Sequence, residues 1–114
     1  MSTVSLSLDE IFDLAKKTLL ANGCDDETAS ILSDLIRNAE RDGSLSHGLF
    51  RLPAYVSGLK SGKINGKGKP EVKKISASVI KVKGNNCLAP VVLSKGLPEL
   101  AKAAKENGVA VLAI

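Results

Sequence analysis

The only histidine of this chain lies in the run Ser46-His47-Gly48, which is the part of the sequence best suited to acid-base chemistry. An imidazole titrates near neutral pH, so it can deliver a proton to a carbonyl oxygen or an imine nitrogen and remove it in the reverse direction. Ser46 could orient the ring or join a proton relay. We therefore treat Ser46 and His47 as candidate catalytic residues.

Arg51 stands four residues after His47, and in a helix that spacing puts two side chains on one face. A guanidinium there can hold a carboxylate through two parallel hydrogen bonds. The free backbone N–H groups of a helix start would add partial positive charge, which favours a bound anion. The alternative is that His47 is a cap or surface residue and that Arg51 lies on a solvated face.

Spacing argues against three other kinds of site. Cys24 and Cys87 have no second cysteine or histidine at ligand distance, which disfavours zinc, and no export signal favours a disulfide. The glycine-rich run 62–69 has the wrong spacing for a P-loop, is followed by Pro70 instead of a hydroxyl residue, and leads into a sequence typical of a strand. No GxGxxG motif occurs, so the standard dinucleotide fingerprint is absent.

The positive charge of the chain comes from residues 60–83, where lysines greatly outnumber the single acid, Glu71. Lysines can follow phosphates along a nucleic acid, but this segment has no arginine for bidentate contacts and no aromatic residue for base stacking. We therefore favour a solvated loop and strand face over nucleic-acid binding.

Two amphipathic helices are predicted to precede the candidate site and to pair with each other. Residues 7–10 hold a capping box before an apolar stripe, and Asn22-Gly23 closes this helix. Asp25 or Asp26 caps the second helix, whose apolar stripe recurs at helical spacing until Asp42-Gly43.

A third helix is predicted directly after the candidate site. Proline lacks a backbone N–H, so Pro53 must lie near the start of this helix, which places that start between Ser46 and Leu52. The helix stops near Ser61-Gly62. The glycine- and lysine-rich residues 62–70 predict an exposed connection, and we place the boundary between a helical segment, 1–69, and an α/β segment, 70–114.

From Glu71 to residue 83, β-branched residues alternate in part with lysine and serine, which predicts one or two half-exposed strands. Residues 90–107 predict a helix that Pro98 should break or restart. Residues 109–114 are continuously apolar and typical of a strand buried on both faces. Such a strand needs neighbours, so we expect the 114 residues to be an N-terminal part of a longer protein or one partner of an assembly.

The composition fits one domain, or part of a larger one, since 44% of the 114 residues are apolar. No run of residues is long and apolar enough for a membrane span, and the N-terminus lacks the pattern of a secretory signal. We therefore expect a cytoplasmic protein of the α/β class.

The run Ala39-Glu-Arg-Asp-Gly-Ser-Leu-Ser-His-Gly-Leu-Phe-Arg-Leu-Pro-Ala-Tyr-Val56 resembles the malate/L-lactate dehydrogenase-like family of NAD(P)-dependent oxidoreductases. Within that family, the residues on both sides of Ser46-His47-Gly48 look most like the Δ1-piperideine-2-carboxylate/Δ1-pyrroline-2-carboxylate reductases. The closing residues 108–114 are similar to the strand of the family that precedes its Asn-x-x-His-Phe segment. The resemblance runs from about residue 6 to the end of the chain. The chain departs from relatives at Ala89-Pro90, where they often carry Gln-Pro, and at Pro98.

The resemblance implies a role for each candidate residue. Ser46 would join a charge relay, His47 would donate the proton, and Arg51 would bind the substrate carboxylate. It also implies a mixed-sheet, non-Rossmann fold that binds NADPH or NADH, mostly through residues beyond Ile114, and a homodimer. The residues in hand would then be inactive by themselves.

The main functional hypothesis is therefore reduction of a cyclic imino acid, Δ1-pyrroline-2-carboxylate or Δ1-piperideine-2-carboxylate, by the full-length protein. A malate, lactate or ureidoglycolate type of 2-hydroxy acid dehydrogenase is the alternative within the same class. Outside that class, the chain could be a non-catalytic structural or interaction module. No metal site and no membrane partner are expected.

Overall fold

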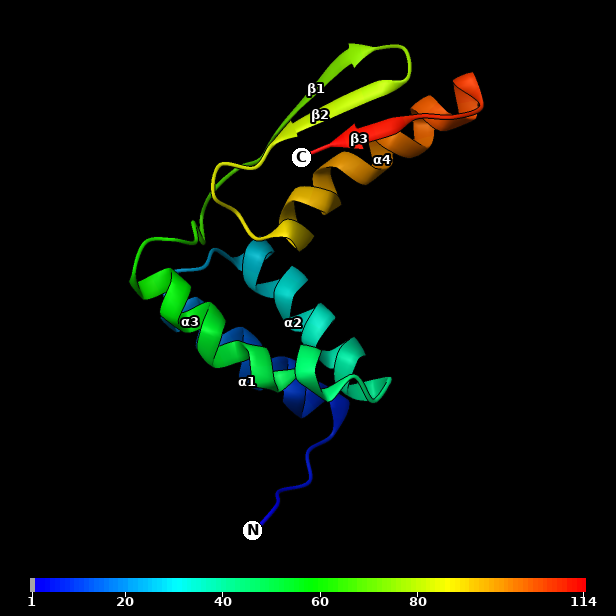
Figure 1. The fold of residues 1–114 in the computed structure, drawn as a ribbon. Coiled ribbons are helices and arrows are strands. Elements are labelled where there is room, and N and C mark those ends of the chain that lie inside the picture. The colour runs from blue at the N-terminus through cyan, green and yellow to red at the C-terminus, as the bar shows by residue number, and fades with distance from the viewer. Residues whose placement is uncertain (1) are drawn as a thin grey trace. The chain divides into compact units, whose positions relative to one another are not determined.

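The computed structural model describes residues 2–114 and divides the chain into two compact units (Figure 1). The first unit ends at Gly66 and consists of helices, and the second, Lys67–Ile114, combines three strands with one long helix. The α/β class expected from the sequence is confirmed. The sequence placed its boundary between residues 69 and 70, slightly beyond the division seen in the structure.

Helix α1, Leu8–Ala21, begins as its capping box predicts. The Ser7 side chain accepts from the backbone N–H of Glu10, and the Glu10 carboxylate accepts from the backbone N–H of Ser7. This second bond lowers the pKa of the Glu10 carboxyl, because it stabilises the charged form. The helix buries three apolar side chains, Ile11, Ala15 and Leu19.

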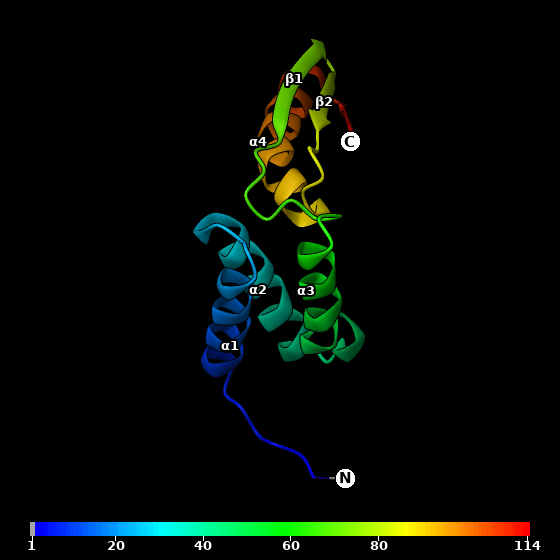
Figure 2. The ribbon, with the colours of Figure 1, turned by 90° about the vertical axis from the view of Figure 1, so that its left-hand side faces the viewer.

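Helix α2, Asp26–Arg41, packs against α1, and the two lie side by side in Figure 2. Asp25 is the N-cap, and its side chain accepts from the backbone N–H of Thr28. Leu32 and Ile36 are fully buried in the contact with α1, so the predicted pairing of the two helices is confirmed.

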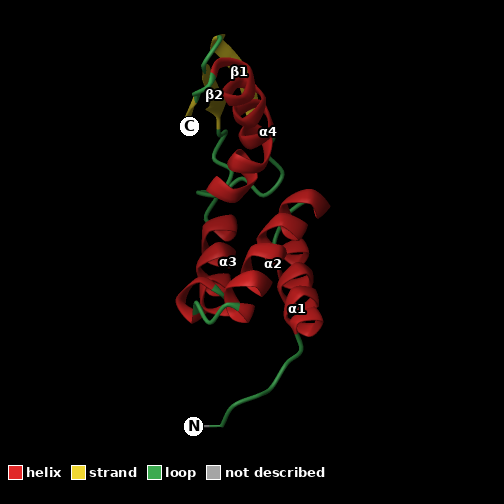
Figure 3. Ribbon diagram, turned by 90° about the vertical axis from the view of Figure 1, so that its right-hand side faces the viewer, coloured by secondary structure: helices red, strands yellow, loops and turns green. Residues whose placement is uncertain are grey.

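Between α2 and the next helix the chain forms two short 3₁₀ turns, η1, Leu45–His47, and η2, Leu49–Arg51. Helix α3, Leu52–Lys60, follows at once, with Pro53 in its first turn as predicted. Figure 3 shows that the first unit contains helices and loops but no strand. The predicted start of the third helix, between Ser46 and Leu52, is confirmed.

A backbone hydrogen bond links the glycine-rich connection to the turn between α1 and α2. The backbone N–H of Asp25 donates to the carbonyl oxygen of Gly66 at 2.9 Å. A Cβ added to Gly66 would lie 2.6 Å from the carbonyl oxygen of Gly23 and 2.8 Å from Leu59 Cδ2. Only glycine therefore lets the connection approach the α1–α2 turn so closely.

The sheet of the second unit has the order β1-β2-β3 and is mixed. Strand β1, Glu71–Ser76, pairs antiparallel with β2, Val79–Lys83, and β2 pairs parallel with β3, Val111–Ala113. The two strands form a hairpin, and the predicted half-exposed pattern is confirmed for β2, whereas every residue of β1 is exposed. In β2, Ile80 and Val82 are buried, whereas the lysines between and after them are exposed.

Helix α4, Ala89–Asn107, connects β2 to β3 and covers one face of the sheet (Figures 1 and 3). The prediction that Pro98 breaks this helix is wrong, because α4 is continuous. Pro98 is exposed, so the hydrogen bond that it removes leaves a carbonyl beside solvent. The opposite side of α4, which includes Val91 and Val92, is buried and holds the helix on the sheet.

The terminal strand is shorter and more exposed than the sequence predicts. β3 covers only Val111–Ala113, and the exposed fraction is 57% for Val111 and 66% for Ile114. The prediction of burial on both faces is wrong for the described residues, because α4 covers one face and β3 lies at the edge of the sheet.

The remaining sequence features are in ordinary surroundings. Cys24 is buried and Cys87 half-buried, and within residues 2–114 the two do not form a disulfide. Burial raises the pKa of the Cys24 thiol, with a further contribution from the negative charge of Asp25. None of the helices in residues 2–114 has the length and apolar run that a bilayer crossing requires.

Candidate functional site

The two candidate residues His47 and Arg51 lie in separate 3₁₀ turns before α3, so the shared helical face that would follow if the helix included both residues does not form. Gly48 lies between the turns, with φ −93° and ψ −135°, far from helical values. The α-helix itself begins only at Leu52, where Pro53 can be accommodated in the first turn. The helical register of four residues therefore does not explain how these side chains meet.

A different set of contacts brings Ser46, His47 and Arg51 together. Ser46 Oγ lies 3.0 Å from His47 Nδ1, and Arg51 Nε donates to the backbone carbonyl oxygen of Ser46 at 3.0 Å. All three residues are exposed. The guanidinium thus folds back onto the turn that carries the imidazole, and both groups face solvent from one short loop.

The contact between Ser46 and His47 determines what each ring nitrogen can do. In the imidazolium, Nδ1–H donates to Ser46 Oγ, so the Nε2–H remains available for transfer. In the neutral tautomer that keeps its hydrogen on Nδ1, Ser46 Oγ still accepts from Nδ1–H, and the lone pair lies at Nε2. The same arrangement can therefore donate a proton in one direction and accept it in the other.

Arg51 differs from the other two arginines of the chain in its partner. Arg37 pairs with Asp34, and Arg41 pairs with Asp42 through two hydrogen bonds, which lowers the pKa of the Asp42 carboxyl. Within residues 2–114, Arg51 has no carboxylate partner. Its Nε is occupied by a carbonyl, so its two Nη atoms can receive a carboxylate end-on.

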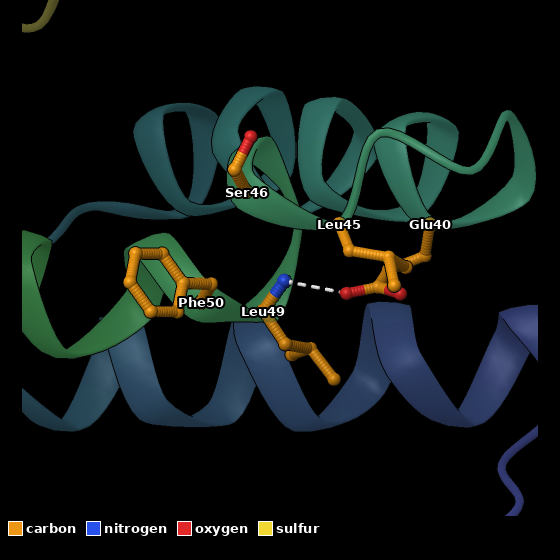
Figure 4. A pocket seen from close by; sticks show the side chains of 5 residues that line it. All are labelled: Glu40, Leu45, Ser46, Leu49 and Phe50. Carbon is orange, nitrogen blue, oxygen red and sulfur yellow. Dashed lines mark hydrogen bonds between the residues drawn. The ribbon is translucent and has the colours of Figure 1, made fainter.

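Glu40 belongs to the site, and sequence reasoning missed it. Its carboxylate accepts from the backbone N–H of Leu49, the first residue of η2, at 2.9 Å (Figure 4). The prediction that free N–H groups at a helix start favour a bound anion is therefore wrong at this position, because Glu40 already occupies the donor. The sequence held one signal for Glu40. An acid in the last turn of a helix opposes the helix dipole, so its presence there indicates a partner elsewhere.

An open hollow of about 680 Å³ lies beside this loop. Five residues line it, Glu40, Leu45, Ser46, Leu49 and Phe50, and Figure 4 shows them as sticks. Leu45 and Phe50 are strongly exposed, so the hollow has an apolar wall next to the serine hydroxyl. His47 and Arg51 do not line it, although they belong to the same loop.

The glycine-rich connection and the metal-ligating residue types of residues 2–114 were the other candidates for a site. The glycine-rich residues 62–70 lead into strand β1 and not into a helix, which confirms that they are not a P-loop. Over residues 2–114 the structure groups no three histidine, cysteine, aspartate or glutamate side chains in a way that could hold a metal ion.

Comparison with known proteins gives consistent relatives. Residues 6–114 match the family model described as malate/L-lactate dehydrogenase. The chain is 40% identical over 111 residues to a Δ1-pyrroline-2-carboxylate reductase from Ancylobacter novellus, covering 97% of this chain and 33% of that protein. It is 38% identical over 109 residues to a malate/(S)-sulfolactate dehydrogenase from Methanothermus fervidus, covering 96% and 32%.

A solved structure has the same fold. The crystal structure of Δ1-piperideine-2-carboxylate reductase from Pseudomonas syringae superposes with a TM-score of 0.93 at 37% identity, covering 98% of this chain and 34% of that one. The chain therefore spans about a third of the length of the relatives that it matches.

Proposed function

Since the chain belongs to the malate/L-lactate dehydrogenase family, we propose that the complete protein reduces a cyclic imino acid, Δ1-pyrroline-2-carboxylate or Δ1-piperideine-2-carboxylate, to the amino acid. The observation that carries this proposal is the loop on which Arg51 and the pair Ser46 and His47 meet. Relatives named for these reactions match almost the whole chain. In this proposal residues 1–69 form the substrate side of the active site.

Each of the three side chains has a distinct task. The Nη atoms of Arg51 hold the substrate carboxylate, which fixes the ring of the substrate over the loop. His47 delivers its Nε2 proton to the imine nitrogen, and Ser46 keeps the imidazole in the orientation and tautomer that this transfer needs. Because the loop faces solvent, His47 can take up a new proton from water after each turnover.

The other reactant in this proposal is NADPH or NADH, which supplies the hydride that reduces the imine carbon. The roles proposed above for His47, Ser46 and Arg51 belong to proton transfer and substrate binding. We also propose, from the family resemblance, that the complete protein is a homodimer, and sedimentation of that protein tests this directly.

The test is turnover of both cyclic imines by the complete protein, followed by the loss of NADPH or NADH absorbance. We expect His47→Ala to lower kcat by about 10²- to 10⁴-fold, the usual contribution of a positioned acid-base group. Lys60→Ala, a change of a solvent-exposed residue outside the site, is the control and should leave turnover unchanged. Unchanged turnover in His47→Ala would show that the proposed site is wrong.

A second candidate function is oxidation and reduction of a malate-type 2-hydroxy acid, which the match to the Methanothermus enzyme favours. The same residues serve that reaction, with a carbonyl oxygen in place of the imine nitrogen as proton acceptor. Assays with oxaloacetate and pyruvate beside the cyclic imines separate the two, because the preferred substrate has the higher kcat/KM.

A further inference from the structure

The Glu40 side chain makes a hydrogen bond from α2 to the loop that carries His47. Its Oε1 atom accepts from the backbone N–H of Leu49 at 2.9 Å, across nine residues of sequence. Glu40 is half-buried, and the backbone between it and Leu49 turns twice. The contact therefore adds a direct bond from α2 to the start of η2, beside the local backbone bonds of the two turns.

Gly48 is the residue that lets this carboxylate approach. A Cβ at position 48 would lie 2.3 Å from Glu40 Oε1, 2.7 Å from Cδ and 2.8 Å from Cγ. A contact below 3.0 Å requires something to shift, and here the flexible Glu40 side chain would shift, so a Cβ at position 48 would displace the carboxylate from its place. Gly48 is buried beneath the carboxylate, whereas Ser46 and His47 on the same loop are exposed.

The loop is fixed at two points, one on each side of His47. Before it, the backbone N–H of Ser44 donates to the carbonyl oxygen of Ala39 at 2.8 Å. After it, the backbone N–H of Leu49 donates to Glu40. Both acceptors lie in the last turns of α2, so the path of the chain between residues 44 and 49 is set by α2.

We propose that Glu40, seated on Gly48, is a positioning residue that holds His47 and Arg51 in register. The inference rests on the proposed function of those two residues. Without the carboxylate, the η2 turn loses the partner of its first N–H group, and the turn can move relative to His47. Catalysis is sensitive to such displacement, because an error of about 1 Å in placement can lower a rate by about 10²-fold.

The experiment combines two measurements on Glu40→Ala and Glu40→Gln in the complete protein. Hydrogen exchange at the Leu49 amide reports the contact itself, and steady-state kinetics report its consequence. We expect Glu40→Ala to accelerate that exchange and to lower kcat by about 10- to 100-fold. Glu40→Gln should keep most of the protection of the Leu49 amide and most of kcat, since an amide oxygen can accept the same N–H.

Asp42→Asn is the matched control, because it removes a negative charge two residues from Glu40 without touching Leu49. Asp42→Asn should change neither hydrogen exchange at the Leu49 amide nor kcat. Gly48→Ala should reproduce the loss seen in Glu40→Ala, and the double variant should lose no more than the worse single one, because both changes break one contact.

The outcomes separate this inference from the proposed function. If hydrogen exchange at the Leu49 amide is unchanged in Glu40→Ala, the inference is wrong. A change in the overall stability of the variant does not alter that conclusion. A normal kcat in Glu40→Ala, when His47→Ala is inactive, would also overturn it and leave the proposed function intact. Full activity of His47→Ala would instead show that the site itself is wrong.

Discussion

Arg51 offers the sharpest test at the level of single residues, because its geometry and not only its charge is involved. Its Nε is occupied by the Ser46 carbonyl, so in the proposed function the two Nη atoms hold the substrate carboxylate. Lysine keeps the charge but cannot offer two parallel donors. Loss of a hydrogen bond between charged groups costs roughly 1.5–3 kcal/mol, so Arg51→Lys should raise KM about 10- to 100-fold with a smaller change in kcat.

The control for this prediction is Arg41→Lys, which makes the same change at an arginine already paired with Asp42. Its KM should equal that of the parent protein. A similar rise in KM for both variants would mean that the loop responds to any loss of a guanidinium, and the assignment of Arg51 to the carboxylate would fail.

The residue types in the sequence point to three residues of the candidate site but not to Glu40. Ser46, His47 and Arg51 could be selected from the sequence, because few side chains exchange protons near neutral pH or bind a carboxylate with two donors. Spacing gave no sign of Glu40, since its partner is a backbone N–H nine residues away and no periodic pattern links the two. Contacts from a side chain to a distant backbone atom leave no spacing rule in a sequence.

Among the features of helices and strands, the helix boundaries were predicted best from the sequence. Ser7 and Asp25 mark the starts of α1 and α2 through local hydrogen bonds, and local bonds depend only on neighbouring residues. The continuity of α4 across Pro98 was not predictable, because burial of the opposite face of the helix decides it. The exposure of β3 was missed for the same reason, since burial depends on what covers the sheet.

Gly96 makes a prediction at the level of the helix–sheet contact. A Cβ at this position of α4 would lie 2.8 Å from Val82 Cγ2 and 2.9 Å from Leu112 Cδ1. Alanine favours a helix interior over glycine by about 1 kcal/mol, whereas overpacking of a tight contact costs about 1–3 kcal/mol. Val82 is buried and β-branched, so it cannot turn aside, and the cost should exceed the gain.

Gly96→Ala should therefore lower the free energy of unfolding by about 1 kcal/mol, measured by urea denaturation. Lys102→Ala, an exposed position of the same helix, should change it by less than about 0.5 kcal/mol. A stabilised Gly96→Ala protein would show that helix propensity outweighs the contact, and that α4 can move away from the sheet at little cost.

At the level of the whole molecule, charge is divided unevenly between the two units. The unit that ends at Gly66 has seven basic and nine acidic side chains, whereas Lys67–Ile114 has nine lysines and three glutamates. On the hairpin, Lys73 and Lys81 are cross-strand partners and exposed. Like charges placed opposite each other destabilise a sheet slightly. A polyanion bound to this face would offset that repulsion.

We expect that face to bind nucleic acid only weakly, because its unit contains no arginine and no aromatic residue. Lysines alone give nonspecific attraction, with a salt dependence of about −0.9 in log–log slope for each phosphate neutralised. The protein should therefore elute from immobilised DNA or RNA below physiological ionic strength. Retention above it, lost in a Lys73→Glu/Lys81→Glu variant but kept in Lys16→Glu/Lys17→Glu, would establish nucleic-acid binding, and the hairpin would then need a functional explanation of its own.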